Sequence, residues 1–184
     1  MRLNTVKKRY AFAIDTRRCV GCNACVLACK AENNLPGEGF RCWIESETKG
    51  TYPNLAMEIR SQRCEQCSDA PCVSNCPTGA SFYGSGGTVL VDKDLCTGCK
   101  ACIAACPYDA RYIHPKGYAD KCTFCLHRVE KGLAPACASA CPTSSLHFGD
   151  VNDPSSDISR LIRERQWKQL EPEAGTKPNL YFLT

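Results

Sequence analysis

The stretch CTGCKACIAACP, residues 96–107, holds four cysteines within twelve residues. Their spacing is Cys96-x2-Cys99-x2-Cys102-x3-Cys106, and a proline follows the last of them. Thiolates at this spacing can bind a [4Fe–4S] cluster, in which each iron corner takes one protein ligand. Because the four corners point in different directions, a tight loop can supply three ligands, and another part of the chain has to supply the fourth.

This spacing is that of the bacterial ferredoxin run, and the chain carries it four times with small changes. Residues 19–29 repeat all three gaps, although Lys30 stands where the proline would be. Residues 64–76 and 122–141 differ only in the lengths of their inner loops, and a proline follows both. Sixteen of the 17 cysteines belong to these groups. The remaining one, Cys42, we expect to be an ordinary buried thiol.

Two other uses of clustered cysteines fit the spacing less well. Disulfides staple many small cysteine-rich domains, but two bridges within one Cys-x2-Cys-x2-Cys-x3-Cys run would be badly strained. Zinc suits two Cys-x2-Cys pairs, but not three closely spaced thiols with a fourth before proline. The spacing therefore favours four [4Fe–4S] clusters as the cofactors, and zinc is the alternative.

The ligand sets follow from two-cluster ferredoxins, in which the fourth cysteine of one run binds the other cluster. The second and third groups are adjacent and form one pair, and the first and fourth groups enclose them as the other pair. In order, the predicted sets 1 to 4 are Cys19, Cys22, Cys25 and Cys141; Cys29, Cys122, Cys125 and Cys137; Cys64, Cys67, Cys72 and Cys106; and Cys76, Cys96, Cys99 and Cys102. The nested order brings the pairs together, so the clusters should form a chain.

The segments around the cysteines predict the elements that position them. Short apolar runs before the first and third groups, and after the second, third and fourth, indicate strands. Each three-residue gap spans about one helical turn, which a following proline should end. We therefore predict an α+β fold with two ferredoxin-like units, each of which binds two clusters. The outer unit comprises residues 1–60 and 111–150, the inner unit residues 61–110, and a C-terminal helix and tail residues 151–184.

Two segments carry no cysteine group. Extended runs at about residues 40–60 predict a hairpin insertion. In the tail, Asp153 as N-cap and Pro154 at the first helical position predict the start of a helix. Residues 172–184 should run extended along the surface, and the apolar residues 180–182 should form an interface with another subunit.

The formal net charge of +4 counts the cysteines as neutral. A [4Fe–4S] core with four thiolates carries about two negative charges, so nearby basic residues should compensate the clusters rather than bind nucleic acid. These basic residues are Arg17, Arg18, Lys30, Lys100 and Lys121. No apolar run is long enough to span a membrane, and the N-terminus lacks the apolar region of a signal peptide. We predict structural roles for the three histidines, and no catalytic residue or substrate site.

The four groups, together with CPTGA, CPYDARY, KCTFCLHRVEKGLAPAC and EAGTKPNLYFL, resemble the iron–sulfur subunits of the molybdopterin oxidoreductase superfamily. The resemblance is to the B components of polysulfide or thiosulfate reductases, with the iron–sulfur subunits of dimethyl sulfoxide reductases as relatives. It implies a non-catalytic subunit that passes electrons along four clusters. The implied partners are a catalytic subunit with a molybdenum or tungsten pterin and an integral membrane subunit that interacts with quinone. In the family, the first group's cluster lies nearest the catalytic subunit, and the clusters of the second and third groups lie toward the membrane.

Three features distinguish this chain from other iron–sulfur subunits of the superfamily and so narrow the choice of relatives. The third group is complete, the chain has no membrane-spanning helix, and the segment before the fourth group is short. The resemblance then implies reduction of a sulfur compound such as polysulfide, thiosulfate or tetrathionate. It also implies a peripheral place in a membrane complex, on the periplasmic or outward face after export on a partner's signal, with the cytoplasmic face as the alternative. A free-standing polyferredoxin is the competing hypothesis, but a pure carrier needs neither the insertion nor the tail.

Overall fold

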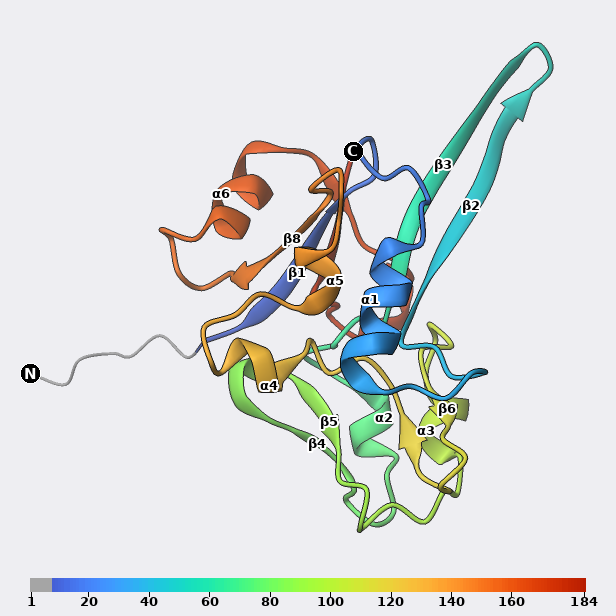
Figure 1. Ribbon diagram of the computed structural model, residues 1–184, viewed down its shortest axis with the longest axis vertical. Coiled ribbons are helices and arrows are strands. Elements are labelled where there is room, and N and C mark those ends of the chain that lie inside the picture. Colours follow the sequence, from blue (N-terminus) through green and yellow to red (C-terminus); the bar gives the residue numbers. More distant parts are fainter. Residues whose placement is uncertain (1–7) are drawn as a thin grey trace, which may run out of the picture.

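The computed structural model describes residues 8–184, which form a mixed α and β fold around the cysteines (Figure 1). At its centre is a four-stranded sheet of order β8-β1-β10-β9. Strand β1 pairs parallel with β10 and antiparallel with β8, and β10 pairs antiparallel with β9. The strands span Leu146–Asp150 (β8), Tyr10–Asp15 (β1), Leu180–Leu183 (β10) and Trp167–Lys168 (β9). Within residues 8–184, no helix is long and apolar enough to cross a membrane.

Strand β1 is buried on both faces, as its uninterrupted apolar sequence predicts. Successive side chains of a strand point to opposite faces, so Phe12 and Ile14 share one face, and Ala11 and Ala13 the other. Phe12 and Ile14 pack in the core that contains many of the cysteines. Ala11 and Ala13 pack with Ile158 of helix α6, Asp157–Glu164. The central sheet therefore separates α6 from the cysteine groups.

The C-terminal residues form strand β10 inside this sheet, and the predicted surface tail is wrong. Phe12 pairs with Leu180 and Ile14 with Phe182. Leu180, Phe182 and Leu183 are fully buried. The apolar residues 180–182 are therefore core residues of this chain rather than an interface with another subunit. The sequence shows their apolar character but not the distant strand with which they pair.

The helix of the tail begins later than predicted. Ser156 is its N-cap, and the Ser156 hydroxyl accepts a hydrogen bond from the Ser159 amide at 3.3 Å. Asp153 instead accepts the amide of Ser155 at 2.9 Å, which makes a turn before the helix. Ser156, rather than Asp153, is therefore the N-cap of the helix.

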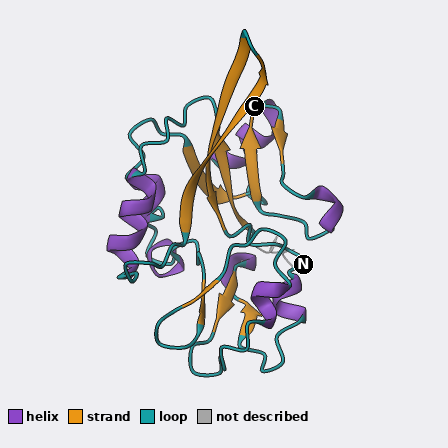
Figure 2. Cartoon of the chain, turned by 90° about the vertical axis from the view of Figure 1, so that its right-hand side faces the viewer, coloured by secondary structure: helices purple, strands orange, loops and turns teal. Residues whose placement is uncertain are grey.

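The predicted hairpin is present and is longer than expected. Strands β2 (Cys42–Thr51) and β3 (Asn54–Arg63) pair antiparallel along their whole length, from Cys42 opposite Arg63 to Thr51 opposite Asn54. The hairpin stands out from the rest of the chain, with its tip far from the other elements (Figures 1 and 2). Its base packs on the first cysteine loop, where an added Cβ at Gly21 would lie 3.3 Å from Ile59.

The remaining elements are short and surround the cysteines. The last two cysteines of the first group, Cys25 and Cys29, lie on the longest helix, α1, which continues past Cys29 because no proline follows it. In the other three groups the helix ends two residues before the last cysteine. The helices span Ala24–Asn33 (α1), Pro71–Ser74 (α2), Ala101–Ala104 (α3), Leu126–Val129 (α4) and Ala136–Ser139 (α5), with 3-10 turns η1 (Ser85–Gly87) and η2 (Pro172–Ala174). Two small hairpins pair β4 (Ser81–Tyr83) with β5 (Val89–Val91) and β6 (Tyr112–Ile113) with β7 (Ala119–Asp120).

Candidate metal centres

The cysteines of set 1 surround one hollow. Cys19, Cys22, Cys25 and Cys141 line it together. The first two lie in the loop after β1, Cys25 lies on α1, and Cys141 comes from the loop between α5 and β8. The amide of Ser145 donates to Cys141 Sγ at 3.3 Å. Three thiols of the first group and one of the fourth are thus brought together.

The cysteines of set 4 surround a second hollow. Cys76, Cys96, Cys99 and Cys102 line it together. The loop that carries three of them turns at Gly98, whose φ is +67° and where a Cβ would lie 2.4 Å from the Gly117 oxygen. Only glycine fits this turn without strain. The fourth thiol, from the second group, approaches after α2.

The cysteines of set 2 lie together in the interior. Burial raises the pKa of Cys122, and the neighbouring Cys29 and Cys137 add to the rise. Burial likewise raises the pKa of Cys125, with Cys29 again beside it. Cys29 lies on α1 and Cys137 on α5, two helices that pack against each other. The thiolate is disfavoured by burial at Cys122 and Cys125, whereas hydrogen bonding lowers the pKa of Cys29 to about 7.

The cysteines of set 3 form the second interior group. Burial raises the pKa of Cys67 to about 12, and Cys64 and Cys72 contribute to the rise as neighbours. Burial also raises the pKa of Cys106, which lies near Cys64. Cys64 also lies near Cys122, so the division of the buried cysteines into sets 2 and 3 stays a prediction. That these groups ligate iron stays a prediction.

The geometry fits a cluster better than a single ion. Within residues 8–184, no group of three or more Cys, His, Asp or Glu side chains is arranged around one metal ion. A zinc ion would need its sulfurs about 2.3 Å from a common point. The thiols of sets 1 and 4 instead stand around a hollow, as the four corners of a cluster require.

Two buried arginines, Arg63 and Arg111, were not identified from the sequence. Arg63 Nη1 donates to Cys137 Sγ at 3.1 Å, and Arg111 Nη2 donates to Cys72 Sγ at 2.8 Å. Within the described residues, Arg63 Nε and two nitrogens of Arg111 have no hydrogen-bond partner. Buried cations need nearby negative charge, which thiolate-bound clusters would supply. The one signal in the sequence is that Arg63 directly precedes Cys64.

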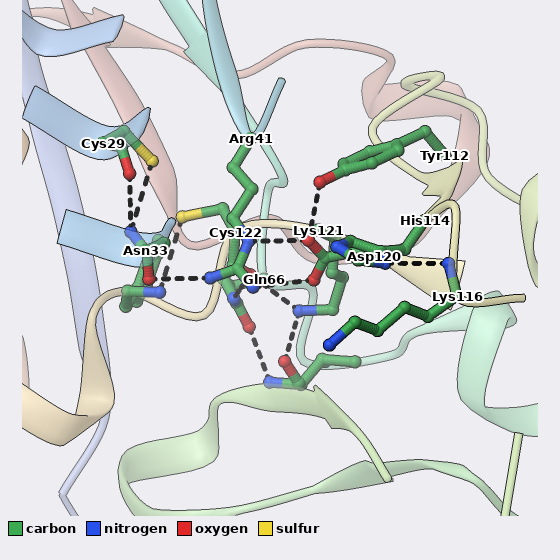
Figure 3. Close-up of polar contacts among 12 residues, drawn as sticks. Cys29, Asn33, Arg41, Gln66, Tyr112, His114, Lys116, Asp120, Lys121 and Cys122 are labelled. Atoms are coloured by element: carbon green, nitrogen blue, oxygen red, sulfur yellow. Dashed lines mark hydrogen bonds and ion pairs between the residues drawn. The ribbon is translucent and has the colours of Figure 1, made fainter. Parts of the chain in front are cut away.

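Of the basic residues expected to compensate the clusters, only Lys121 is buried. Its ammonium donates to the Cys122 carbonyl at 2.8 Å and to the Val89 carbonyl (Figure 3). Arg17, Arg18 and Lys100 are exposed, and Lys30 is half-buried. The sequence thus identifies one interior cation, and the other four lie nearer the surface.

A buried ion pair ties the start of the hairpin to strand β7. Arg41 and Asp120 meet at 2.8 Å, and the Tyr112 hydroxyl donates to the same carboxylate at 2.7 Å (Figure 3). Arg41 also donates to Asn33, whose amide donates to the Cys29 carbonyl at 2.9 Å. The pair therefore braces helix α1 beside a predicted ligand.

The seventeenth cysteine and the histidines have structural contacts. Cys42 is 2% exposed, and its Sγ donates to the Cys25 carbonyl at 3.5 Å, so it is a buried thiol as expected. His127 bonds Glu32 at 2.8 Å, and His114 stacks on Tyr118 with ring centroids 4.5 Å apart.

Comparison with known proteins shows that the four cysteine groups lie in recognised domains. A family described as the 4Fe-4S dicluster domain matches residues 55–151, and one described as a 4Fe-4S binding domain matches residues 16–32. The chain is 48% identical over 96% of its length to "Protein NrfC homolog" of Haemophilus influenzae, covering 80% of that protein. It is 42% identical over 96% to the B component of polysulfide reductase of Wolinella succinogenes, covering 94%. It is 40% identical over 96% to the B component of tetrathionate reductase of Salmonella typhimurium, covering 73%.

Proposed function

The chain belongs to the 4Fe-4S dicluster family, and from this membership we propose that it is the electron-transfer subunit of a respiratory reductase complex. The resemblance predicted from the sequence is confirmed by relatives named as components of polysulfide reductase and tetrathionate reductase. The observation that carries the proposal is that the cysteines of set 1 and those of set 4 each line one hollow, with thiols from two different groups of the sequence in each.

We propose that sets 1 to 4 hold one [4Fe–4S] cluster each. A bound cluster supplies one-electron oxidation and reduction. The chain supplies four thiolates per site. Cys25 and Cys29 lie one turn apart on α1, and Cys122 of set 2 lies near Cys64 of set 3. Arg111 lies near Cys64 of set 3 and Cys102 of set 4. These contacts support a row in the order 1, 2, 3, 4.

The two ends of this proposed row reach the surface. Cys22 in set 1 and Cys99 in set 4 are exposed, whereas all four cysteines of set 2 are buried. Electrons have to enter and leave at sites that a partner can approach. The exposed thiols therefore mark the proposed entry and exit: Cys22 lies in the loop before α1 and Cys99 in the loop before α3, and Figure 1 shows these two helices in different parts of the molecule.

We propose two partners on this basis: a molybdopterin-containing catalytic subunit and an integral membrane subunit that interacts with quinone. Set 1 would face the first and set 4 the second. The proposed substrate of the complex is a sulfur compound such as polysulfide, thiosulfate or tetrathionate, supported by the names of two relatives. The chain itself would carry no catalytic residue.

The proposed units follow the cysteine pairs. Sets 1 and 2 belong to the outer unit with the hairpin, and sets 3 and 4 to the inner unit. The small hairpin of β6 and β7 packs in the inner core, where the Ala119 amide donates to Cys96 Sγ at 3.4 Å. We therefore assign residues 111–120 to the inner unit and keep the other boundaries as predicted.

We also propose that the complex faces the periplasm or the outside, and that the chain is exported after its clusters are built. Thiols stay reduced in the cytoplasm, whereas unassembled cysteines in an oxidising compartment form disulfides. Cluster assembly before export, on the signal of a partner, avoids that loss.

Anaerobic purification of the tagged chain from membranes tests the proposal. We expect about sixteen irons and as many sulfides per chain, together with a large copurifying protein that contains molybdenum or tungsten. Recovery of the iron-loaded chain without partners from the soluble fraction would instead identify a diffusible polyferredoxin. A zinc-loaded chain that lacks sulfide would refute the cluster assignment.

A further inference from the structure

Arg63 and Arg111 occupy matching places at the two interior cysteine sets. Arg63 ends strand β3 and is 1% exposed, and its guanidinium bonds a sulfur of set 2. Arg111 precedes strand β6 and is 5% exposed, and its guanidinium bonds a sulfur of set 3. Each is further held by a serine hydroxyl, Ser61 at 2.6 Å and Ser81 at 2.9 Å.

The two guanidiniums remain charged in this interior. The guanidinium of arginine does not lose its proton in proteins. Arg63 and Arg111 are nonetheless buried, and each donates to a cysteine sulfur, Cys137 at 3.1 Å and Cys72 at 2.8 Å. A buried cation is tolerated only beside compensating negative charge. Each arginine is thus matched to the thiolates that it contacts.

The outer sets differ from the interior sets in exposure rather than in backbone hydrogen bonds. Backbone amides donate to the sulfurs of Cys141 and Cys96 in the outer sets and also to Cys122 in set 2. Sets 1 and 4 also contain the two exposed cysteines, so water can stabilise added charge there. Sets 2 and 3 lie deeper, where added negative charge is less favourable. Burial by itself would therefore lower the reduction potentials of the interior centres.

We propose that Arg63 and Arg111 are potential-setting residues, which raise the reduction potentials of the clusters bound by sets 2 and 3. On reduction one electron joins the bound centre, and the arginine stays protonated before and after. The fixed positive charge stabilises the reduced state and offsets the effect of burial, which keeps the interior centres close in potential to the exposed ends. The inference rests on the proposed function, because it requires clusters in these sets.

Potentiometric titration of the anaerobic full chain with dithionite, followed by electron paramagnetic resonance, tests this inference. Cys125→Ser and Cys67→Ser identify the signals of sets 2 and 3. Arg63→Gln should make reduction at set 2 about tenfold less favourable, which corresponds to about 59 mV. Arg111→Gln should do the same at set 3. Smaller shifts should reach set 1 from Arg63 and set 4 from Arg111, because their fields extend to Cys25 and Cys102.

The control is Arg160→Gln, which removes a charge from the exposed pair with Asp157 on α6 and should shift no potential. A wild-type chain that takes up no iron refutes the proposed function. A fully loaded chain in which both glutamine variants titrate like wild type refutes only the role of the arginines, as does an equal shift of all four signals. Should a glutamine variant lose iron, the lysine substitution at the same position is measured instead. Lysine keeps the positive charge but lacks the forked donors of arginine, so the equilibrium constant for reduction of the cluster should fall about threefold. A lysine variant whose potential falls by the full shift of about 59 mV, despite its retained charge, would overturn the inference.

Discussion

Leu180→Ala tests whether the C-terminal strand is part of the core. Leu180 is fully buried, pairs with Phe12 of β1 and packs in the same core as cysteines of sets 1 to 3. Replacing a buried leucine by alanine removes its transfer free energy and leaves a cavity, at a cost of about 2–5 kcal/mol. Domains of this size are stable by only about 5–15 kcal/mol. The substitution should therefore remove a large part of the free energy of unfolding.

The assay is anaerobic urea unfolding of the iron-loaded chain, followed by visible absorbance and far-ultraviolet circular dichroism. Because cluster loss is irreversible, midpoints are compared after a fixed incubation time. A loss of about 3 kcal/mol should lower the midpoint by about 1–3 M urea. The matched control is Leu133→Ala, the same change at a side chain that is 51% exposed, which should shift the midpoint little. Equal midpoints for the two variants would refute the placement of β10 in the core.

Three further predictions concern the cysteine groups and their supports. Cys42→Ser should leave about sixteen irons per chain, because the other thiols complete the four sets; a loss of about four irons would make Cys42 a ligand. Gly98→Ala should lose the cluster of set 4, as measured by iron analysis. Gly132→Ala, also at positive φ but with nothing within 4 Å of an added Cβ, should keep all clusters. Equal iron contents of the two variants would contradict this prediction. Asp120→Asn and Arg41→Gln should each lower the stability by about 3–5 kcal/mol, and the double variant by less than their sum, because each single change leaves a buried charge unpaired; additive losses in urea unfolding would exclude a coupled pair.

The cysteine spacing allowed the four groups to be predicted before the fold was known. Each group is local in the sequence. One helical turn moves the fourth cysteine away from its own loop, which is why we predict that it binds the other cluster of its pair. The hairpin was equally accessible, because its strands are adjacent and pair through one turn at Tyr52 and Pro53. Local spacing therefore carries most of the candidate sites.

The features that the sequence did not reveal depend on distant contacts. Strand β10 pairs with β1, which lies near the other end of the sequence. Nothing in the apolar run LYFL shows whether it forms a core strand or an interface with another subunit. Arginines usually lie at the surface, so the sequence alone does not predict that Arg63 and Arg111 are buried. Their burial depends on cysteine sulfurs that other segments of the chain supply. The charge of the clusters predicts that compensating cations exist, but the sequence does not show which basic residues are buried beside the cysteines.

The central claim is that each site is completed by a cysteine from another group, and paired substitutions test it most directly. Cys64→Ser, Cys106→Ser and Cys99→Ser are prepared in the full chain, and the paramagnetic signals of the reduced clusters are compared with wild type. Serine binds iron less well than thiolate, so the affected centre should shift in potential or lose iron. We predict that Cys64→Ser and Cys106→Ser perturb one common signal and that Cys99→Ser perturbs another. A common signal for Cys106→Ser and Cys99→Ser, with Cys64→Ser separate, would show that each run binds its own cluster and would contradict the crossed arrangement.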